Sequence, residues 1–359
     1  MGANDIAIAS ARPGFEVDGQ RQAALDSGLL HLALAETTEG LASCELEFGN
    51  WGLNGQGQLG FLWFDKQVLD FGKTLALKLG TTTLFEGRIM AIEGRFPQLA
   101  PPTVVLRVDD KLQQLRMTRR TRCFETVSDA DLVRRIASEH GLQADVDLPG
   151  PTWPLVVQAN ESDLAFLRRR ALVADADLMF LGGRLAAQAR SARRQPPLRL
   201  TQGAALRHFT VAADLAHQRT ELTCSGWDVA AKQAVAVAAG ASAVAAEGGS
   251  GDSGPQLLQS AIGAHPDLVG HRVPFDDAGA RAEAEAHLRV LARRFVRGRG
   301  ETEADSRLRA GGTVQLDGLG PLFDGVYGVT DTLLRFDAAC GLRMEFGAER
   351  AGLGRSGTP

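Results

Sequence analysis

The sequence predicts an α+β fold that is mainly β, in which two strand-rich blocks flank a small block of helices and strands. Three observations support this prediction. Short runs of alternating apolar and polar residues, separated by glycine-rich breaks, fill much of the first hundred residues, as expected for strands. Residues 121–190 contain two helical patterns with capping residues. After residue 198, strand patterns return around one strong helical pattern at 278–296.

The N-terminal block, residues 1–117, is predicted to be a β domain. In its second strand, apolar side chains alternate with two glutamates, so that one face would be buried and the other exposed to solvent. The predicted strands are residues 29–35, 42–48, 74–79, 84–92 and 103–108.

The middle block, residues 118–195, is predicted to be a small α+β domain with two helices. Ser128 fits the N-cap of the first helix, with an acidic residue at the third helical position. Gly141 stands where a glycine commonly ends a helix. Ser162 fits the N-cap of the second helix, residues 162–173, because its hydroxyl can accept a hydrogen bond from a nearby backbone amide.

Packing and turn chemistry complete the prediction for this block. Phe166 or Leu167 should be buried against the first helix, since a small module has few other ways to cover both helices. Residues 177–188 are predicted to form a β-hairpin that turns at Gly182-Gly183. Two further strand patterns lie at residues 144–148 and 155–158.

The C-terminal block, residues 196–350, is predicted to be a second β domain. The helix predicted at 278–296 has a buried stripe of Ala284, Leu288, Leu291 and Phe295. The expected strands lie within residues 198–226 and at 313–316, 325–336 and 342–349.

Alanine, glycine and serine dominate residues 230–263, which are therefore predicted to form a flexible loop that can begin as a short helix. Such a composition lacks the apolar side chains that offset the entropy cost of ordering. Residues 247–254 are expected to be cleaved first in limited proteolysis. The tail, residues 351–359, is predicted to be disordered.

Charge and hydropathy exclude some classes of function. The formal net charge is −4 over 359 residues, whereas proteins that coat nucleic acid usually carry a strong basic excess. The first residues lack the basic and apolar regions of a secretory signal. No apolar run approaches the length of about 20 residues that spans a bilayer. Synthesis in the cytoplasm without a signal peptide is therefore expected, with no membrane insertion by this chain and no nucleic-acid specificity.

No catalytic, cofactor-binding or metal-ligating residue is predicted. The cysteines form no C-x-x-C pair and are interpreted as small buried residues. The histidines form no metal-binding doublet. Residues 55–60 fit G-x-G-x-x-G, but neither a strand before them nor a helix after them is indicated, as a dinucleotide site requires. The residues concerned are Cys44, Cys123, Cys224 and Cys340, and His31, His140, His208, His217, His265, His271 and His287.

Clusters of charged residues have structural interpretations as well. The acidic pairs at 109–110 and 276–277 are expected at turns or element ends, and Asp175 and Asp177 are expected to form turns or caps. The arginine clusters are interpreted as solvated faces or polar rims between subunits, where arginine is common. These clusters lie at residues 116–122, 168–170, 190–194 and 293–299.

Several segments resemble the phage late control gene D protein family, which includes the hub portion of VgrG proteins. The most specific is Val157–Arg169, which is similar to the family's Q-x-N-x-S-D-x-x-F-L-x-R pattern. The matching segments stand in family order and run from about Thr118 to Arg350, whereas the N-terminal block matches only in its β-rich character. The chain departs from the family at Gly328 and residues 331–334, which lack an expected aromatic or histidine, and in its unusually uniform Ala/Gly-rich loop. The other matching segments are residues 128–142, 225–234, 308–330 and 336–350.

This resemblance implies a non-enzymatic baseplate hub of a contractile phage tail or contractile injection system. It implies two tail-tube-like β-barrel domains flanking the α+β domain. Three copies would present six such domains, which lets a trimeric spike meet a hexameric tube, because interfaces between closed rings must match in symmetry. The implied partners are two further copies of the chain, a separate spike protein, the inner tube protein and other baseplate proteins.

Two alternatives of other classes stay open at this point. One is a particle-associated hydrolase that cleaves cell walls, which a carboxylate pair in a cleft would favour. The other is a stand-alone arginine-rich binding module, which steep salt dependence of nucleic-acid affinity would favour. The sequence does not distinguish a phage tail from a tailocin, an extracellular injection particle or a type VI apparatus.

Overall fold

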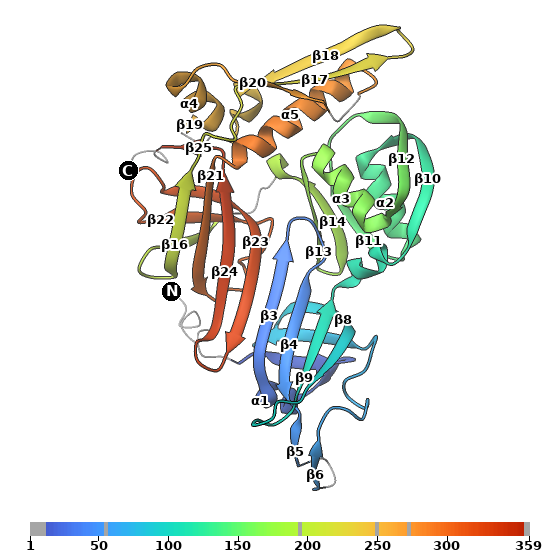
Figure 1. Ribbon diagram of the computed structural model, residues 1–359, viewed down its shortest axis with the longest axis vertical. Coiled ribbons are helices and arrows are strands. Elements are labelled where there is room, and N and C mark those ends of the chain that lie inside the picture. The colour runs from blue at the N-terminus through green and yellow to red at the C-terminus, as the bar shows by residue number, and fades with distance from the viewer. Residues whose placement is uncertain (1–11, 54–56, 193–195, 248–250, 271–273, 355–359) are drawn as a thin grey trace.

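The computed structural model describes residues 12–53, 57–192, 196–247, 251–270 and 274–354. Its main element is a 13-stranded sheet that runs along the long axis of the molecule (Figure 1). The mainly β fold predicted from the sequence is confirmed. An α+β module packs beside this sheet, and a long helix, α5, lies across one end of it (Figure 1).

The N-terminal strands form one half of the large sheet, in the order β4-β9-β8-β7-β1-β2 after β3. The sequence predicts four of these strands, β3, β4, β8 and β9, to within a few residues at each end, and it predicts both ends of β7 correctly. The elements are β1 (Gly14–Val17), β2 (Gln20–Arg21), α1 (Ala23–Gly28), β3 (Leu29–Thr37), β4 (Ser43–Gly49), β5 (Trp51–Leu53), β6 (Leu59–Phe61), β7 (Thr74–Leu79), β8 (Thr82–Arg95) and β9 (Thr103–Asp109).

The C-terminal strands form the other half, and the two halves join where β3 pairs with β23 in antiparallel register. One hydrophobic core extends under both halves, from Phe15 and Phe48 to Tyr327 and Phe346. The elements are β15 (Leu198–Thr201), β16 (Leu206–Ala213), β21 (Val296–Glu303), β22 (Thr313–Asp317), β23 (Gly325–Asp337) and β24 (Gly341–Arg350).

The α+β module has a separate core formed by two helices and two small sheets. Its hairpin turns at Gly182-Gly183, and both glycines have positive φ, as the predicted two-residue turn requires. The elements are η2 (Lys111–Arg116), β10 (Arg119–Ser128), α2 (Asp129–Glu139), β11 (Gln143–Asp147), β12 (Thr152–Ser162), α3 (Asp163–Val173), β13 (Ala176–Leu181), β14 (Arg184–Ala189) and η3 (Arg190–Ala192).

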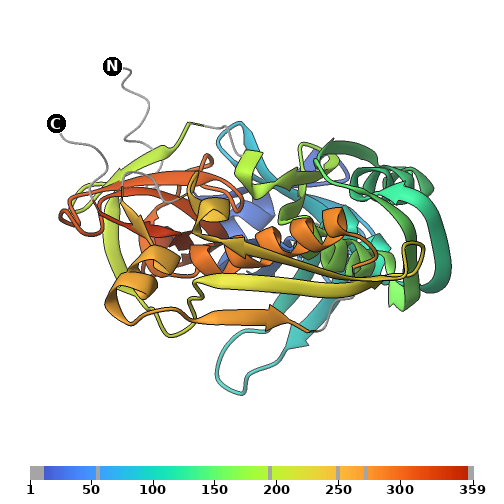
Figure 2. The ribbon, with the colours of Figure 1, turned by 90° about the horizontal axis from the view of Figure 1, so that it is seen from above.

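A third, smaller layer contains the long helix and a three-stranded sheet. In Figure 2, α5 extends from the C-terminal strands toward the α+β module, next to the long hairpin of this layer. The elements are β17 (Glu221–Asp228), β18 (Gln233–Gly240), η4 (Ala241–Val244), β19 (Asp252–Ser253), α4 (Gly254–Ala261), β20 (Pro266–Val269), α5 (Asp277–Arg293) and β25 (Gly352–Leu353).

The loop predicted at residues 230–263 is wrong for most of its length. Residues 233–240 form β18, in which Val235, Val237 and Ala239 are buried against α5 while the residues between them are exposed. The alternation of small apolar residues is a strand pattern that the low-complexity composition hid. The predicted cleavage region, 247–254, includes residues 248–250, which lie outside the described residues.

Smaller differences concern element ends. The helix predicted at 278–296 ends at Arg293, so Phe295 belongs to the following segment and is buried in the core of the large sheet rather than on the helix stripe. Residues 351–354 are not part of a disordered tail, because Ala351 is buried and β25 pairs with β19. Residues 355–359 lie outside the described part of the chain.

Candidate assembly site

The segment that carries the family resemblance lies at the start of α3 and fixes the local fold. Ser162 caps α3 by accepting a hydrogen bond from the Ala165 amide, as predicted. Gln158 donates to the Asp163 carboxylate at 2.9 Å and to the Glu161 carbonyl at 3.0 Å, which closes the turn before the helix. Asn160 lies in this turn with a φ of 49°, a conformation that asparagine tolerates better than most residues.

Asp163 is the buried centre of a polar cluster. Its carboxylate accepts hydrogen bonds from His140 at 2.8 Å and from Arg122 at 3.0 Å. Burial raises the pKa of Asp163, but the hydrogen bonds from His140 and Gln158 and the nearby arginine charges outweigh burial and lower it below the usual range. Arg122 of β10 also donates to Glu139 at the end of α2, so the cluster links β10, α2 and α3.

The lowered pKa predicts a pH-dependent contribution of His140 to stability. A carboxyl group with a lowered folded pKa stabilises the fold above its unfolded pKa of about 3.9 and loses that effect as pH falls through the folded value. His140→Ala should therefore cost about 1.5 kcal/mol near pH 6, the lower value for hydrogen bonds to charged groups. Urea unfolding should show this cost shrinking as the pH falls below about 4.

Asp163→Asn supplies the control for this measurement. In that background the carboxyl group cannot titrate, so the effect of His140→Ala should not change over the acidic range. An equally large cost of His140→Ala at all pH values in the unmodified chain would mean that the imidazole acts by packing alone.

Buried ion pairs join the α+β module to the other layers. Arg293 at the end of α5 donates to both carboxylate oxygens of Asp175 and to Glu247, and Arg289 donates to Asp175 at 3.1 Å. Burial by itself lowers the pKa of Arg293, but the carboxylates of Asp175 and Glu247 raise it well above its usual range. We call these residues, with Asp177 and Arg190, the ionic joint.

The same joint reaches the large sheet. Arg190 pairs with Asp177 at 2.9 Å and lies 3.6 Å from Glu349 of β24. Arg168 of α3 donates to the carbonyls of Glu39 and Gly40 at the turn after β3. One arginine from each of three predicted clusters thus contributes to contacts between layers, namely Arg168, Arg190 and Arg293. The interpretation of Asp175 and Asp177 as turn or cap residues misses this role.

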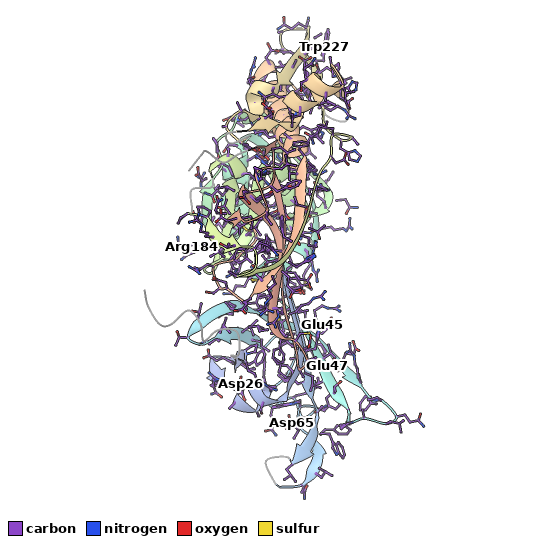
Figure 3. The ribbon with its side chains drawn as sticks, turned by 90° about the vertical axis from the view of Figure 1, so that its left-hand side faces the viewer. Asp26, Glu45, Glu47, Asp65, Arg184 and Trp227 are labelled. Atoms are coloured by element: carbon purple, nitrogen blue, oxygen red, sulfur yellow. The ribbon has the colours of Figure 1, made fainter. Side chains whose placement is uncertain are left out.

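An exposed apolar arm, the β5–β6 hairpin, projects from the end of the molecule opposite to α5 (Figure 1). Trp51 and Phe61, on the β5–β6 hairpin, contact each other edge-to-face with ring centroids 5.3 Å apart, and Phe96 packs beside them. The side chains of Trp51 and Phe61 are about half exposed, and those of Phe96, Leu53 and Leu59 about two thirds exposed. Figure 3 places Asp65, near this arm, and Trp227 at opposite ends of the molecule. Clusters of exposed apolar side chains are typical of protein interfaces.

A polar groove of about 760 Å³ crosses the exposed face of the large sheet near the ionic joint. Four arginines line it, together with three acidic residues, and we call it the arginine groove. Its floor consists of small and hydroxyl-bearing residues on β16, β21, β24 and β23. The lining residues are Thr37, Thr38, Glu39, Arg190, Thr210, Ala212, Arg294, Arg297, Gly298, Arg299, Thr330, Asp331, Gly347, Ala348 and Glu349.

The cysteines and the glycine-rich stretch differ in part from the predictions, while His271 and residues 55–56 lie outside the described residues. Cys44 and Cys224 are buried, as predicted, but Cys123 and Cys340 are exposed, so the interpretation of the cysteines as buried is wrong for two of the four. Within the described ranges, no group of three or more metal-ligating side chains comes together. A strand, β6, begins at the end of the G-x-G-x-x-G stretch, where a dinucleotide site requires a helix. No helix in the described ranges is long and apolar enough to span a membrane.

A family model matches a large part of the chain. The model of the family described as the Alg8 N-terminal domain matches residues 61–333, which is more than half of the chain. The chain belongs to this family. The family's name states no activity and differs from that of the late control gene D family, so the latter resemblance stays a prediction. No curated protein matches the chain significantly.

Solved structures show which known fold the chain has. A 43 kDa tail protein of prophage MuSo2 from Shewanella oneidensis is 12% identical, with a TM-score of 0.69 over 94% of this chain and 98% of that one. A tail protein from Neisseria meningitidis MC58 is 11% identical, with a TM-score of 0.67 over 95% and 96% of the two chains. The chain therefore has the fold of phage tail proteins.

A third structure extends this likeness to a secretion machine. It is an Escherichia coli component of the type VI secretion system, described as structurally similar to the T4 bacteriophage tail proteins gp27 and gp5. It is 12% identical to this chain, with a TM-score of 0.59 over 96% of this chain and 79% of that one. None of the three is described as an enzyme.

Proposed function

We propose that the chain is a structural hub in the baseplate of a contractile phage tail or contractile injection system. The fold that it shares with phage tail proteins over nearly its whole length carries this proposal. The contacts of the signature segment support it, since Gln158, Ser162 and Asp163 hold a turn and a helix cap together. We assign no catalytic, cofactor or metal-binding residue.

In this proposal, residues 1–117 and 196–350 are two tube-like β domains and residues 118–195 are the α+β domain between them. Three copies would then offer six tube-like domains to a hexameric inner tube and threefold symmetry to a spike. The joining of β3 to β23 supports the arrangement, because it holds the two β domains side by side in one sheet. The exposed apolar arm at β5–β6 supplies an assembly surface.

The proposal predicts that the full-length chain forms a trimer, either alone or with its spike protein. Mass photometry of the chain, with and without the spike encoded nearest to it in the genome, measures this directly. Phe61→Glu, which puts a charge on the exposed apolar arm, should weaken assembly while the subunit stays folded. A chain that stays monomeric with the spike present, or forms a twofold dimer, would contradict the hub assignment.

A further inference from the structure

We propose that the arginine groove binds an extended, carboxylate-bearing segment of a partner protein. The charges, the shape and the location of the groove support this proposal. It does not depend on which particle contains the protein, so it can be tested separately from the proposed hub function.

The charges of the groove are incompletely compensated. Arg299 pairs with Asp331 at 3.1 Å, and Arg190 pairs within the ionic joint. Arg294 and Arg297 are both exposed, and neither pairs with a carboxylate of the described residues. Two neighbouring guanidinium groups without acidic partners form a site for carboxylates, to which arginine donates two parallel hydrogen bonds.

The backbone of β21 fixes where these arginines point. Arg297 and Arg299 alternate along the strand with Gly298 and Gly300 and therefore share one face. A side chain at Gly298 would collide with the ring of Phe209, since a Cβ atom placed there would lie 2.1 Å from that ring. The ring covers the glycine side, so the arginines occupy the side that opens into the groove.

The floor of the groove is low on the side of β16. Ala212 of β16 lies opposite Arg297 and carries only a methyl group, whereas the side chains of Thr330 and Asp331 cover Gly347 of β24. A bulge in β23 lets these two consecutive residues both line the groove, and Thr330 donates to Asp331 at 2.7 Å. An extended segment can therefore lie over β16 and β21, with its carboxylates toward Arg294 and Arg297.

The acidic residues of the groove indicate a protein segment as the occupant in preference to a nucleic acid. Glu39, Asp331 and Glu349 lie along the same groove, where they would repel a continuous row of phosphates. A protein segment can place single carboxylates opposite Arg294 and Arg297 and neutral residues opposite the acidic side chains. The net charge of −4 for the chain also disfavours binding to a polyanion.

Fluorescence anisotropy with the full-length chain and a labelled peptide of alternating glutamate and serine residues tests this proposal. Arg294→Ala and Arg297→Ala should each weaken binding about tenfold, and the double variant about a hundredfold, as loss of hydrogen bonds to a charged group implies. Both side chains are exposed, so the variants should keep the far-ultraviolet circular dichroism of the parent. The matched control is Arg335→Ala on β23, outside the groove, which should change the affinity less than about twofold.

Other outcomes would overturn the proposal. Absence of peptide binding, or equal affinity for the parent and the double variant, would mean that the groove is not a carboxylate site. Tighter binding of polyphosphate or duplex DNA than of the glutamate-serine peptide, lost in the same double variant, would make it a phosphate site. Preference for hexalysine would assign the binding to the acidic residues.

Discussion

Replacing Arg293 with methionine should destabilise the protein by about 3–5 kcal/mol, the usual cost of removing one partner of a buried ion pair. Arg293 is 7% exposed and Asp175 3% exposed, so the substitution leaves the carboxylate of Asp175 in a site where water cannot replace the lost guanidinium. Arg289 still reaches Asp175 at 3.1 Å, but Glu247 loses the charged partner that binds both of its oxygens.

The neighbouring residue supplies a matched control. Arg294 is exposed and lies outside the ion pairs, so Arg294→Met should change stability by less than about 0.5 kcal/mol. Urea unfolding monitored by far-ultraviolet circular dichroism measures both variants. The double variant Arg293→Met/Asp175→Asn should recover part of the loss, because it removes one of the unpaired charges. Equal effects of Arg293→Met and Arg294→Met would show that the joint does not hold the layers together.

The sequence shows Arg190 and Arg293 as members of arginine clusters, but it does not predict the ionic joint that they form. Arg293 and Asp175 are separated by 118 positions, and no local spacing rule links them. The same applies to the junction of the two sheet halves, where Thr37 pairs with Asp331. In contrast, the helix caps at Ser128 and Ser162 follow from residues within three positions of each other, and the structure confirms both.

The hairpin β17–β18 shows a different reason for failure. Its second strand, residues 233–240, contains only glutamine, alanine, valine and glycine. The side chains are small, so the strand buries little apolar area by itself and its composition resembles that of a linker. The strand is held in place by α5, whose buried alanines allow the helix to approach β18 closely. Tertiary packing therefore decided an element that local composition had assigned to a loop.

The candidate surfaces were less predictable than the strands. The arm that carries Trp51 and Phe61 lies where the sequence indicates a glycine-rich break between strands. Its two strands have three residues each, and an alternating pattern of that length is too short to detect. The arginine groove combines β16, β21, β23 and β24 with the turn after β3, so it exists only once the sheet is assembled. The sequence shows Arg294 and Arg297 as members of one cluster, but it does not show that both line the same groove.

Leu167→Ala should destabilise the α+β module by about 2–5 kcal/mol, as truncations of buried leucines do. Leu167 is 1% exposed and belongs to the core formed by α2, α3 and the adjoining strands. Beside it, Phe166 stacks on Phe124 with ring centroids 5.5 Å apart, so the surrounding side chains are fixed and cannot easily collapse into the space. A cavity should remain, and its size sets where the cost falls within this range.

Leu172→Ala on the same helix supplies the control, because Leu172 is 51% exposed and the same truncation there creates no cavity. Its cost should stay below about 0.5 kcal/mol. Trp153 lies in the same core and contacts the Arg170 guanidinium. Its fluorescence reports unfolding of the module once the other three tryptophans, Trp51, Trp63 and Trp227, are replaced by phenylalanine. In the hub interpretation, trimer formation by Leu167→Ala should decline only at the urea concentrations where Trp153 reports unfolding. Loss of the trimer with the module still folded would place Leu167 in an interface instead of the core.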